Sequence, residues 1–265
     1  MSESADASPL RVLQLTDTHL YADPAGTLYD CNTEDSLRRV LEAVRAQEHA
    51  PDLVLLTGDL THDGSVQAYS RLAGLLDDAF TAPVWCLPGN HDEAAVLRQT
   101  LAGEGVVGVP EGTIADWQLV LLDSTLPASE GGHLADAELE RLDSALQSHR
   151  ASHALVCLHH NPVPMGSRWL DTMTVDNAPA LFAVLDRHPR VRALLWGHVH
   201  QPFDGTRNGV RLLASPSTCV QFLPGSESFA LDSRPPGYRW LLLHPDGAVE
   251  TSVHYVNGRP SASEA

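Results

Sequence analysis

The stretch LLWGHVHQP, residues 194–202, carries an apolar run into a glycine and then places two histidines two positions apart. At this spacing, His198 and His200 are compatible with a packing pair, with one clamp on a single metal ion, or with ligands of two separate ions. A lone H-x-H is more often a satisfied pair than a ligand set. The choice between these interpretations depends on what the rest of the chain contributes.

Short apolar runs recur along the chain, with helical patterns between most of them. They predict strands at 11–16, 52–57, 83–88, 118–123, 154–159, 192–197, 210–215 and 239–244. Most of these runs are apolar on both faces, which is typical of sheets covered by helices. Helices are predicted over 33–47, after the polar starters Asn32 and Thr33, and over 65–79, 92–102, 135–149 and 177–188. This order predicts two packed sheets flanked by helices in one α/β domain over 10–256, with disordered tails at 1–9 and 257–265.

Five short polar patches each follow one of these strands. They supply Asp17 and His19 in TDTH, Asp59 in TGDLTHDG, Asn90, His91 and Asp92 in PGNHD, His159 and His160 in LHHNP, and His198 and His200 in GHVH. Ligands collect beyond the carboxyl ends of the strands in an α/β sheet. We therefore expect the five patches to converge on one crevice.

Spacing predicts which side chains of the patches point inward. In an extended chain residues i and i+2 share a face, so the aspartate and histidine of TDTH point the same way, as do the two histidines of GHVH. Val199 then faces the core. Of the neighbours His159 and His160 only one can face the crevice, and the spacing leaves open which.

The chemistry of these side chains indicates a metal site. Carboxylates, imidazoles and one amide, without a thiolate, suit iron, manganese, cobalt or zinc rather than a structural cysteine site. There are more ligands than one ion uses while keeping an open position, so two ions that share a carboxylate are the economical solution. Paired ions about 3.5–4 Å apart hold the attacking and leaving oxygens of an in-line displacement at phosphorus.

Each patch taken alone also has an ordinary structural explanation. The glycine–asparagine of GNHD is common turn chemistry, Asp92 suits a turn or helix cap as well as a partner that orients His91, and Gly197 suits a plain turn. The five patches together, in this order, favour a site. The other histidines lack such a context and are expected to be solvated or satisfied: His49, His133, His149, His153, His188, His244 and His254.

Composition narrows the possible partners. The 265 residues include 34 acidic and 17 basic side chains, all of the latter arginine, for a net charge of −17. Such a surface repels phosphate backbones and anionic lipid, so we expect neither a nucleic-acid polymer nor a membrane as partner. No apolar run reaches the ~18 residues of a membrane span, and the first residues lack a signal-peptide pattern, so we expect a cytoplasmic protein. The four cysteines are scattered singly and are expected to be reduced and buried: Cys31, Cys86, Cys157 and Cys219.

In residue type and order, the patches resemble the signature of the calcineurin-like metallophosphoesterases: D-x-H, G-D, G-N-H-[DE], H and G-H-x-H. The resemblance implies a four-layer α/β/β/α sandwich and two metal ions. It also implies that the first histidine of the HH pair is the ligand. The implied ligand sets are Asp17, His19 and His200 for one ion, Asn90, His159 and His198 for the other, and Asp59 bridging both.

Later segments, including WLDTMTVDN, GHVHQPFDGTRNGVRLLASPSTCVQF and PPGYRW, resemble the bacterial CpdA-type cyclic-AMP phosphodiesterases, which are class III cyclic-nucleotide phosphodiesterases. This resemblance implies hydrolysis of 3′,5′-cyclic AMP to 5′-AMP by in-line attack of a metal-bound hydroxide. Asp59 and His91 are the implied catalytic residues, with His91 beside the leaving oxygen as a hydrogen-bond donor or general acid. Iron or manganese is the expected metal, with zinc or cobalt as alternatives. Substrate contacts are expected from Asn90, His91, His62, Trp169, Asp171 and the segment 217–222.

Two other functions compete with this one. The first is a broad phosphodiesterase that acts on glycerophosphodiesters or 2′,3′-cyclic nucleotides. The second is a non-catalytic scaffold with the same fold. Scaffolds of this superfamily have typically lost metal ligands, whereas this chain retains every one, which favours an enzyme.

Overall fold

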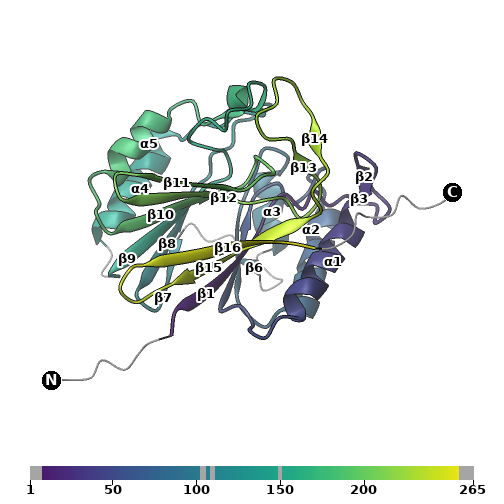
Figure 1. Ribbon diagram of the computed structural model, residues 1–265, viewed down its shortest axis with the longest axis horizontal. Helices are drawn as coiled ribbons and strands as arrows, with labels where there is room; N and C mark the ends of the chain where they lie inside the picture. Colours follow the sequence, from purple (N-terminus) through teal and green to yellow (C-terminus); the bar gives the residue numbers. More distant parts are fainter. Residues whose placement is uncertain (1–7, 102–105, 108–110, 149–150, 257–265) are drawn as a thin grey trace.

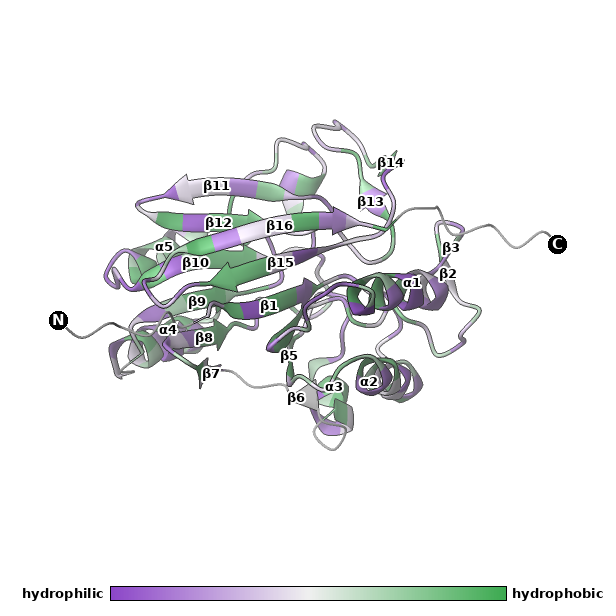
Figure 2. Ribbon diagram, turned by 60° about the horizontal axis from the view of Figure 1, so that its bottom comes forward, coloured by the Kyte–Doolittle hydropathy of each residue, from purple (hydrophilic) through white to green (hydrophobic). Residues whose placement is uncertain are grey.

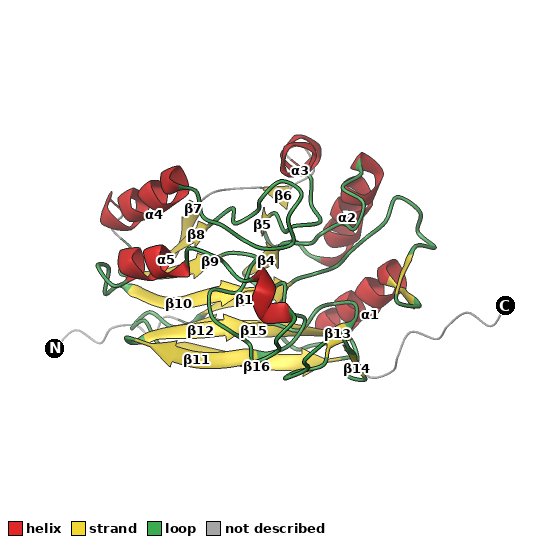
Figure 3. Ribbon diagram, turned by 90° about the horizontal axis from the view of Figure 1, so that it is seen from above, coloured by secondary structure: helices red, strands yellow, loops and turns green. Residues whose placement is uncertain are grey.

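Two six-stranded β-sheets face each other at the centre of the computed structural model, with helices on their outer sides (Figure 1 and Figure 3). The structure describes residues 8–101, 106–107, 111–148 and 151–256. The expected disordered tails, apart from residues 8 and 9, lie outside the described residues, as does His149.

The first sheet has the strand order β16-β15-β1-β4-β5-β6. Four parallel strands form one side of it: β1 (Leu10–Leu15), β4 (Leu53–Thr57), β5 (Val84–Leu87) and β6 (Val106–Val107). On the other side β15 (Gly237–Leu243) pairs antiparallel with β1, and β16 (Val249–Tyr255) pairs antiparallel with β15. A separate small hairpin, β2 (Thr27–Leu28) and β3 (Cys31–Asn32), follows β1 in the chain.

The second sheet has the order β11-β12-β10-β9-β8-β7. Its central strands are parallel: β8 (Trp117–Leu121), β9 (His153–Cys157), β10 (Val191–Trp196) and β12 (Val210–Ala214). The edge strands β7 (Glu111–Ile114) and β11 (Phe203–Arg207) pair antiparallel with their neighbours. A second small hairpin consists of β13 (Gln221–Phe222) and β14 (Leu231–Asp232).

The helices cover the outer faces of the two sheets. Helices α1 (Thr33–Arg45), α2 (Val66–Ala79) and α3 (Ala94–Leu101) pack on the first sheet, and α4 (Asp136–Ser148) and α5 (Ala178–Leu185) pack on the second. A 3₁₀ turn, η1, spans Leu170–Met173. Asn32 begins α1 by accepting a hydrogen bond from the backbone N–H of Asp35 at 2.8 Å. The predicted apolar stripe of this helix is buried: Leu37, Val40, Leu41 and Val44.

Three apolar cores separate four layers, in agreement with the predicted α/β/β/α sandwich. One core lies between the first sheet and α1–α3, a second between the second sheet and α4–α5, and a third between the two sheets. Figure 2 shows β10 as mostly hydrophobic, whereas β11 at the sheet edge is largely hydrophilic. Parallel strands that are covered on both faces need apolar residues at nearly every position. Val199 is fully buried in the second core, as predicted.

All eight predicted strands are present, and each predicted helix is found within a few residues of its predicted ends. The edge strands β6, β7, β11 and β16 and the two small hairpins are not among the predicted strands. In β11, exposed residues alternate with half-buried ones, as they do in most of β16, so the apolar runs that identify the central strands are missing there. Within the described part of the chain, no helix has the length and apolar character needed to cross a membrane.

Candidate active site

Five loops meet at the carboxyl ends of β1, β4, β5, β9 and β10, as the position of the polar patches predicts. Backbone hydrogen bonds hold the loops side by side. The N–H of Asp17 donates to the carbonyl of Gly58 at 3.0 Å, and the N–H of His19 donates to that of Asp59 at 2.9 Å. The N–H of Gly197 donates to the carbonyl of His159 at 3.1 Å within the second sheet. The N–H of His198 donates to Asp17 Oδ1 at 3.1 Å, so residues from both sheets share one site.

Asp17, His19 and His200 form the first group of converging ligand atoms. The Nε2 atoms of His19 and His200 are 3.3 Å apart, and His200 Nε2 is 3.4 Å from Asp17 Oδ1. His200 Nδ1 donates to the backbone carbonyl of Val220 at 2.7 Å, which leaves the Nε2 lone pair directed at the group. All three side chains are buried.

Asp59, Asn90, His159 and His198 form the second group. His159 Nε2 lies 3.2 Å from Asn90 Oδ1 and 3.4 Å from Asp59 Oδ1, while its Nδ1 donates to the carbonyl of Thr57 at 2.8 Å. The rings of His159 and His198 are 5.1 Å apart. The other oxygen of Asp59, Oδ2, is 3.7 Å from His19 Nε2, so this carboxylate lies between the two groups.

These groups fit metal ions on geometric and chemical grounds. Ligand atoms about 2.0–2.1 Å from a tetrahedral ion lie about 3.3–3.4 Å from one another, which matches the separations among Asp17, His19 and His200. Two of the imidazoles donate from Nδ1 to a backbone carbonyl and direct Nε2 inward, as metal-ligating histidines do. Among the described residues, His198 Nε2 is buried and has no hydrogen-bond partner. A buried nitrogen without a hydrogen-bond partner is suited to bind a metal ion.

For His19, His198 and Asp59 the pKa shifts favour the protonation states that metal ligands require, whereas in His159 the charge of Asp59 outweighs burial and raises the pKa to about 9. Burial lowers the pKa of His19 and of His198 well below the ordinary histidine value, so both imidazoles are neutral at pH 7. Burial alone would raise the pKa of Asp59, but the imidazoles of His159 and His19 outweigh it and hold the pKa well below its usual range. A neutral His19, a neutral His198 and an ionised Asp59 are in the form in which these residue types bind metal.

The backbone at the candidate ligands corrects one premise of the sequence analysis. Asp17, His19, Asp59, His198 and His200 all have a positive φ, between 44° and 64°, rather than the extended conformation assumed for the i, i+2 argument. A left-handed conformation costs a non-glycine residue roughly 1–2 kcal/mol. Strained backbone of this kind concentrates at functional sites, where the surrounding structure maintains it.

Two glycines allow the loops to approach so closely. A Cβ on Gly197 would collide with Thr16 Oγ1 and would lie 2.9 Å from Asp17 Oδ2. A Cβ on Gly89 would collide with the backbone N and the carboxylate of Asp59. Gly197 is therefore needed for close packing against the aspartate, rather than as a plain turn residue.

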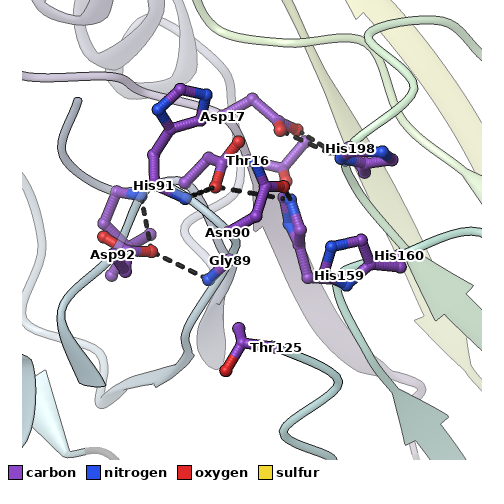
Figure 4. A network of polar contacts seen from close by, with 12 residues as sticks. Thr16, Asp17, Gly89, Asn90, His91, Asp92, Thr125, His159, His160 and His198 are labelled. Carbon is purple, nitrogen blue, oxygen red and sulfur yellow. Dashed lines mark hydrogen bonds and ion pairs between the residues drawn. The ribbon is translucent and has the colours of Figure 1, made fainter. Parts of the chain in front are cut away.

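His159 and His160 point to different surroundings. The ring of His159 faces Asn90 and Asp59, as the distances above show and as Figure 4 illustrates for Asn90. His160 Nδ1 instead contacts the hydroxyl of Ser124 at 2.8 Å, and burial lowers its pKa to about 3. His160 is a neutral, buried residue that borders the second group, with its ring 4.8 Å from that of His198.

His91 and His62 lie on one side of the first group. Their rings stack with centroids 4.6 Å apart, and His62 Nδ1 is 3.4 Å from His19 Nδ1. The backbone N–H of His91 donates to Asp59 Oδ1 at 2.9 Å, which places the ring next to the bridging position. Asn90 and His91 both line the cavity above the ligand groups.

Asp92 holds two loops together and makes no hydrogen bond to the ring of His91. Its carboxylate accepts from the backbone N–H groups of Leu60, Thr61 and Gly89 and from the hydroxyl of Tyr69 (Figure 4 shows the contact with Gly89). Burial, together with the charge of Asp59, raises its pKa to about 6. Its backbone N–H donates to the carbonyl of Gly89 at 3.1 Å, so its position supports the turn interpretation of this residue.

A cavity of about 420 Å³ opens above the ligand groups. Of the expected substrate contacts, Trp169 lines it together with Asn90, His91 and Phe222. Asp171 is not among its described lining residues, because its carboxylate accepts from the backbone N–H groups of Met165 and Gly166, at 2.6 and 3.1 Å. His62 is likewise not part of the described lining.

The cavity also has walls that the sequence analysis did not predict. They are formed by Tyr29, Glu130, Thr172, Met173 and Phe229. Tyr29 lies in the turn between β2 and β3, and Phe229 precedes β14. No local pattern marks either residue, since only the folded chain brings the two hairpins to the site.

Comparisons with known proteins agree with this geometry. A family model described as calcineurin-like phosphoesterase matches residues 10–202. The chain is 44% identical over 258 residues to the 3′,5′-cyclic adenosine monophosphate phosphodiesterase CpdA of Pseudomonas aeruginosa, covering 96% of this chain and 92% of the relative. It is 43% identical over 251 residues to the enzyme of the same name from Escherichia coli strain K12, covering 94% and 91%.

Solved structures share the fold at low sequence identity. A dimetal phosphatase from Danio rerio has a TM-score of 0.61 at 18% identity, covering 95% of this chain and 100% of that chain. A purple acid phosphatase from yellow lupin seeds has a TM-score of 0.62 at 14% identity, covering 98% of this chain and 57% of that chain. The family model spans well over half of the residues, and the CpdA relatives align along nearly the whole length. The chain belongs to the calcineurin-like phosphoesterase family.

Proposed function

We propose that this chain is a dinuclear-metal phosphodiesterase that hydrolyses 3′,5′-cyclic AMP to 5′-AMP. The observation that carries the proposal is the position of Asp59, whose two carboxylate oxygens face the two ligand groups on the floor of the cavity. The substrate follows from the relatives named as 3′,5′-cyclic adenosine monophosphate phosphodiesterases, which align along almost the whole chain.

Proteins of this family use a dinuclear metal site, and the ligand groups of this chain fit one. We assign one ion to Asp17, His19 and His200 and the other to Asn90, His159 and His198, with Asp59 between them. Carboxylate, imidazole and amide ligands favour iron or manganese, with zinc or cobalt as alternatives. Because all four histidine ligands are buried, the ligand set is preorganised.

Bound divalent ions supply Lewis-acid stabilisation of phosphoryl charge and make water more acidic. The balanced reaction adds water across the P–O3′ bond, with the hydroxyl going to phosphorus and a proton going to O3′. His91 is suited to hold that proton, since its backbone is fixed by Asp59 and its ring borders the cavity. His62 stacks on His91 and keeps its ring in place.

The net charge of −17 repels large anions more strongly than it repels a singly charged cyclic nucleotide. A polyanion would meet the acidic surface over many contacts, whereas a cyclic nucleotide carries a single charge into a cavity whose floor holds cations. This balance supports a small-molecule cyclic nucleotide as the partner. We also propose a cytoplasmic location and a single domain over 10–256. The location is supported by the four cysteines, which are all free, as expected for a reducing compartment.

The test is hydrolysis of 3′,5′-cyclic AMP by metal-loaded protein, with Asp59→Asn as the variant. We expect 5′-AMP as the product and a loss of more than about a hundredfold in Asp59→Asn, because even residues that only support metal ligands cost 10–100-fold when removed. Asp204→Asn, the same change at an exposed carboxylate on β11 that pairs with Arg211, is the matched control.

Two results would contradict the proposal in different ways. If the wild-type protein leaves 3′,5′-cyclic AMP intact and cleaves glycerophosphodiesters or 2′,3′-cyclic nucleotides, the substrate is wrong and the metal chemistry stands. If Asp59→Asn abolishes metal binding and leaves the biological role of the protein intact, the chain is a scaffold.

A further inference from the structure

Four aromatic side chains from separate segments form a continuous wall along the outer part of the cavity; they are Tyr29, Trp169, Phe222 and Phe229, and we call them the aromatic rim. Trp169 meets Phe222 and Phe229 edge to face, with centroids 5.1 and 5.3 Å apart and interplanar angles of 76° and 80°. Tyr29 and Phe229 are 5.0 Å apart. The rim therefore packs as one unit, although its members are far apart in the sequence.

The aromatic rim is connected directly to the metal ligands. Phe222 stacks face to face on His200, with centroids 4.1 Å apart and an interplanar angle of 5°. Phe229 lies 5.7 Å from Phe222, further from that ligand. A molecule whose phosphate occupies the floor of the cavity therefore has aromatic faces beside the rest of its structure.

The outer rings are exposed although they are large and hydrophobic. Tyr29 is 52% and Phe229 is 43% exposed, which leaves apolar surface in water beside the candidate active site. Exposed apolar surface in such a place is typical of ligand binding. A flat, uncharged group would cover these faces and remove them from contact with water.

The charged side chains near the aromatic rim limit which chemical group of a ligand can bind there. The lining of the cavity includes no arginine, and beyond the ligand groups its one described charged side chain is Glu130. An anionic group would be repelled there. A quaternary ammonium would need rings arranged around a central gap, whereas Trp169 packs edge to face against both Phe222 and Phe229.

We propose that the aromatic rim binds the purine base of the substrate by stacking, with Phe229 and Trp169 as the residues that distinguish nucleotides from other phosphodiesters. This inference rests on the proposed function for the identity of the base. Stacking of a base on an aromatic side chain contributes roughly five- to 150-fold in affinity. The contribution is similar for the ground state and the transition state, so it affects KM rather than kcat.

The test compares two substrates that share the cyclic phosphate and differ in the base. These are 3′,5′-cyclic AMP and the abasic ribose 3′,5′-cyclic phosphate, each assayed with the metal-loaded full chain. For Phe229→Ala we expect the ratio of kcat/KM between the two substrates to fall about tenfold, through a higher KM for cyclic AMP. The matched control is Leu231→Ala on the same hairpin, because Leu231 is 41% exposed and lines a different cavity.

A binding measurement separates this inference from the proposed function. Calorimetric titration with 5′-AMP and with ribose 5-phosphate should show a preference for 5′-AMP that Phe229→Ala reduces about tenfold and Leu231→Ala leaves in place. If this result appears in a protein that does not hydrolyse cyclic AMP, the aromatic rim binds the base and the proposed reaction is wrong.

Other results would overturn the inference while leaving the proposed function intact. One is hydrolysis of cyclic AMP with an unchanged substrate ratio in Phe229→Ala. A second is an equal rise in KM for both substrates, which would show a general distortion of the cavity. A third is a larger effect on glycerophosphocholine than on cyclic AMP, which would assign the rim to an ammonium group.

Discussion

Replacing Gly197 with alanine tests whether the close approach of the loops creates the site. The new Cβ would collide with Thr16 Oγ1 and lie 2.9 Å from both Asp17 Oδ2 and the Thr57 carbonyl. Favourable contacts with carbon begin near 3.5 Å, so the Asp17 and Thr57 oxygens have to move by roughly 0.6 Å and Thr16 Oγ1 by more than about 1 Å. The Asp17 carboxylate accepts from the backbone N–H of His198 and contacts His200, so the shift reaches both histidines.

We expect two measurable effects of Gly197→Ala. A misplacement of about 1 Å costs on the order of a hundredfold in rate, so kcat/KM for 3′,5′-cyclic AMP should fall by about that factor. Overpacking costs roughly 1–3 kcal/mol, which for a chain of this size lowers the Tm by roughly 2–5 °C. Activity assays with saturating metal, metal analysis and calorimetry measure these quantities.

Gly74→Ala is the matched control, because Gly74 lies in α2 and a Cβ there has no atom within 4 Å. An alanine in a helix is more stable than glycine by roughly 0.5–1 kcal/mol, so this variant should keep its activity and gain a little in Tm. Wild-type activity and metal content in Gly197→Ala would refute the argument that close packing at this glycine positions the ligands.

Three further predictions concern metal, hydrogen bonds and packing. Chelation should lower the Tm of the wild-type protein, because each site held at 100 times its Kd contributes roughly 2.7 kcal/mol of stability that is lost with the metal. The Tm of metal-free Asp59→Asn should not change, and calorimetry with and without chelator measures both. Tyr69→Phe should destabilise the chain by roughly 1–3 kcal/mol, because Asp92 and the N–H of Glu93 each lose a buried partner; an unchanged denaturation midpoint in urea would contradict this. Leu37→Ala, at a fully buried position of α1, should cost roughly 2–5 kcal/mol by the same measurement, and a loss below 1 kcal/mol would show that α1 packs loosely.

The central strands and the ligand groups could be predicted because their signals are local. A strand buried on both faces is apolar at nearly every position, as in β4 and β10. A polar patch directly after such a strand lies at the carboxyl end of the sheet. The edge strands β11 and β16 meet solvent along one side and carry mixed residues, so their patterns are weak.

The backbone conformation of the ligands and the composition of the aromatic rim could not be predicted from the sequence, because both depend on contacts between distant segments. Asp17 and His200 adopt a left-handed backbone that no spacing rule indicates, although their placement in one site was expected. Tyr29 and Phe229 come from a turn and a loop, and they meet only because two small hairpins fold over the same cavity. Asp171 was expected at the substrate, but its carboxylate is occupied by two backbone N–H groups of its own loop.

The most direct test of the central claim is a titration of metal-free protein with Mn²⁺, in which the formation of 5′-AMP from 3′,5′-cyclic AMP is measured against the number of ions bound per chain. Two ligand groups with a carboxylate between them predict that activity reaches its maximum at two bound ions and that Asp59→Asn stays inactive throughout. Full activity with one bound ion or none, or a product other than 5′-AMP, would contradict the account.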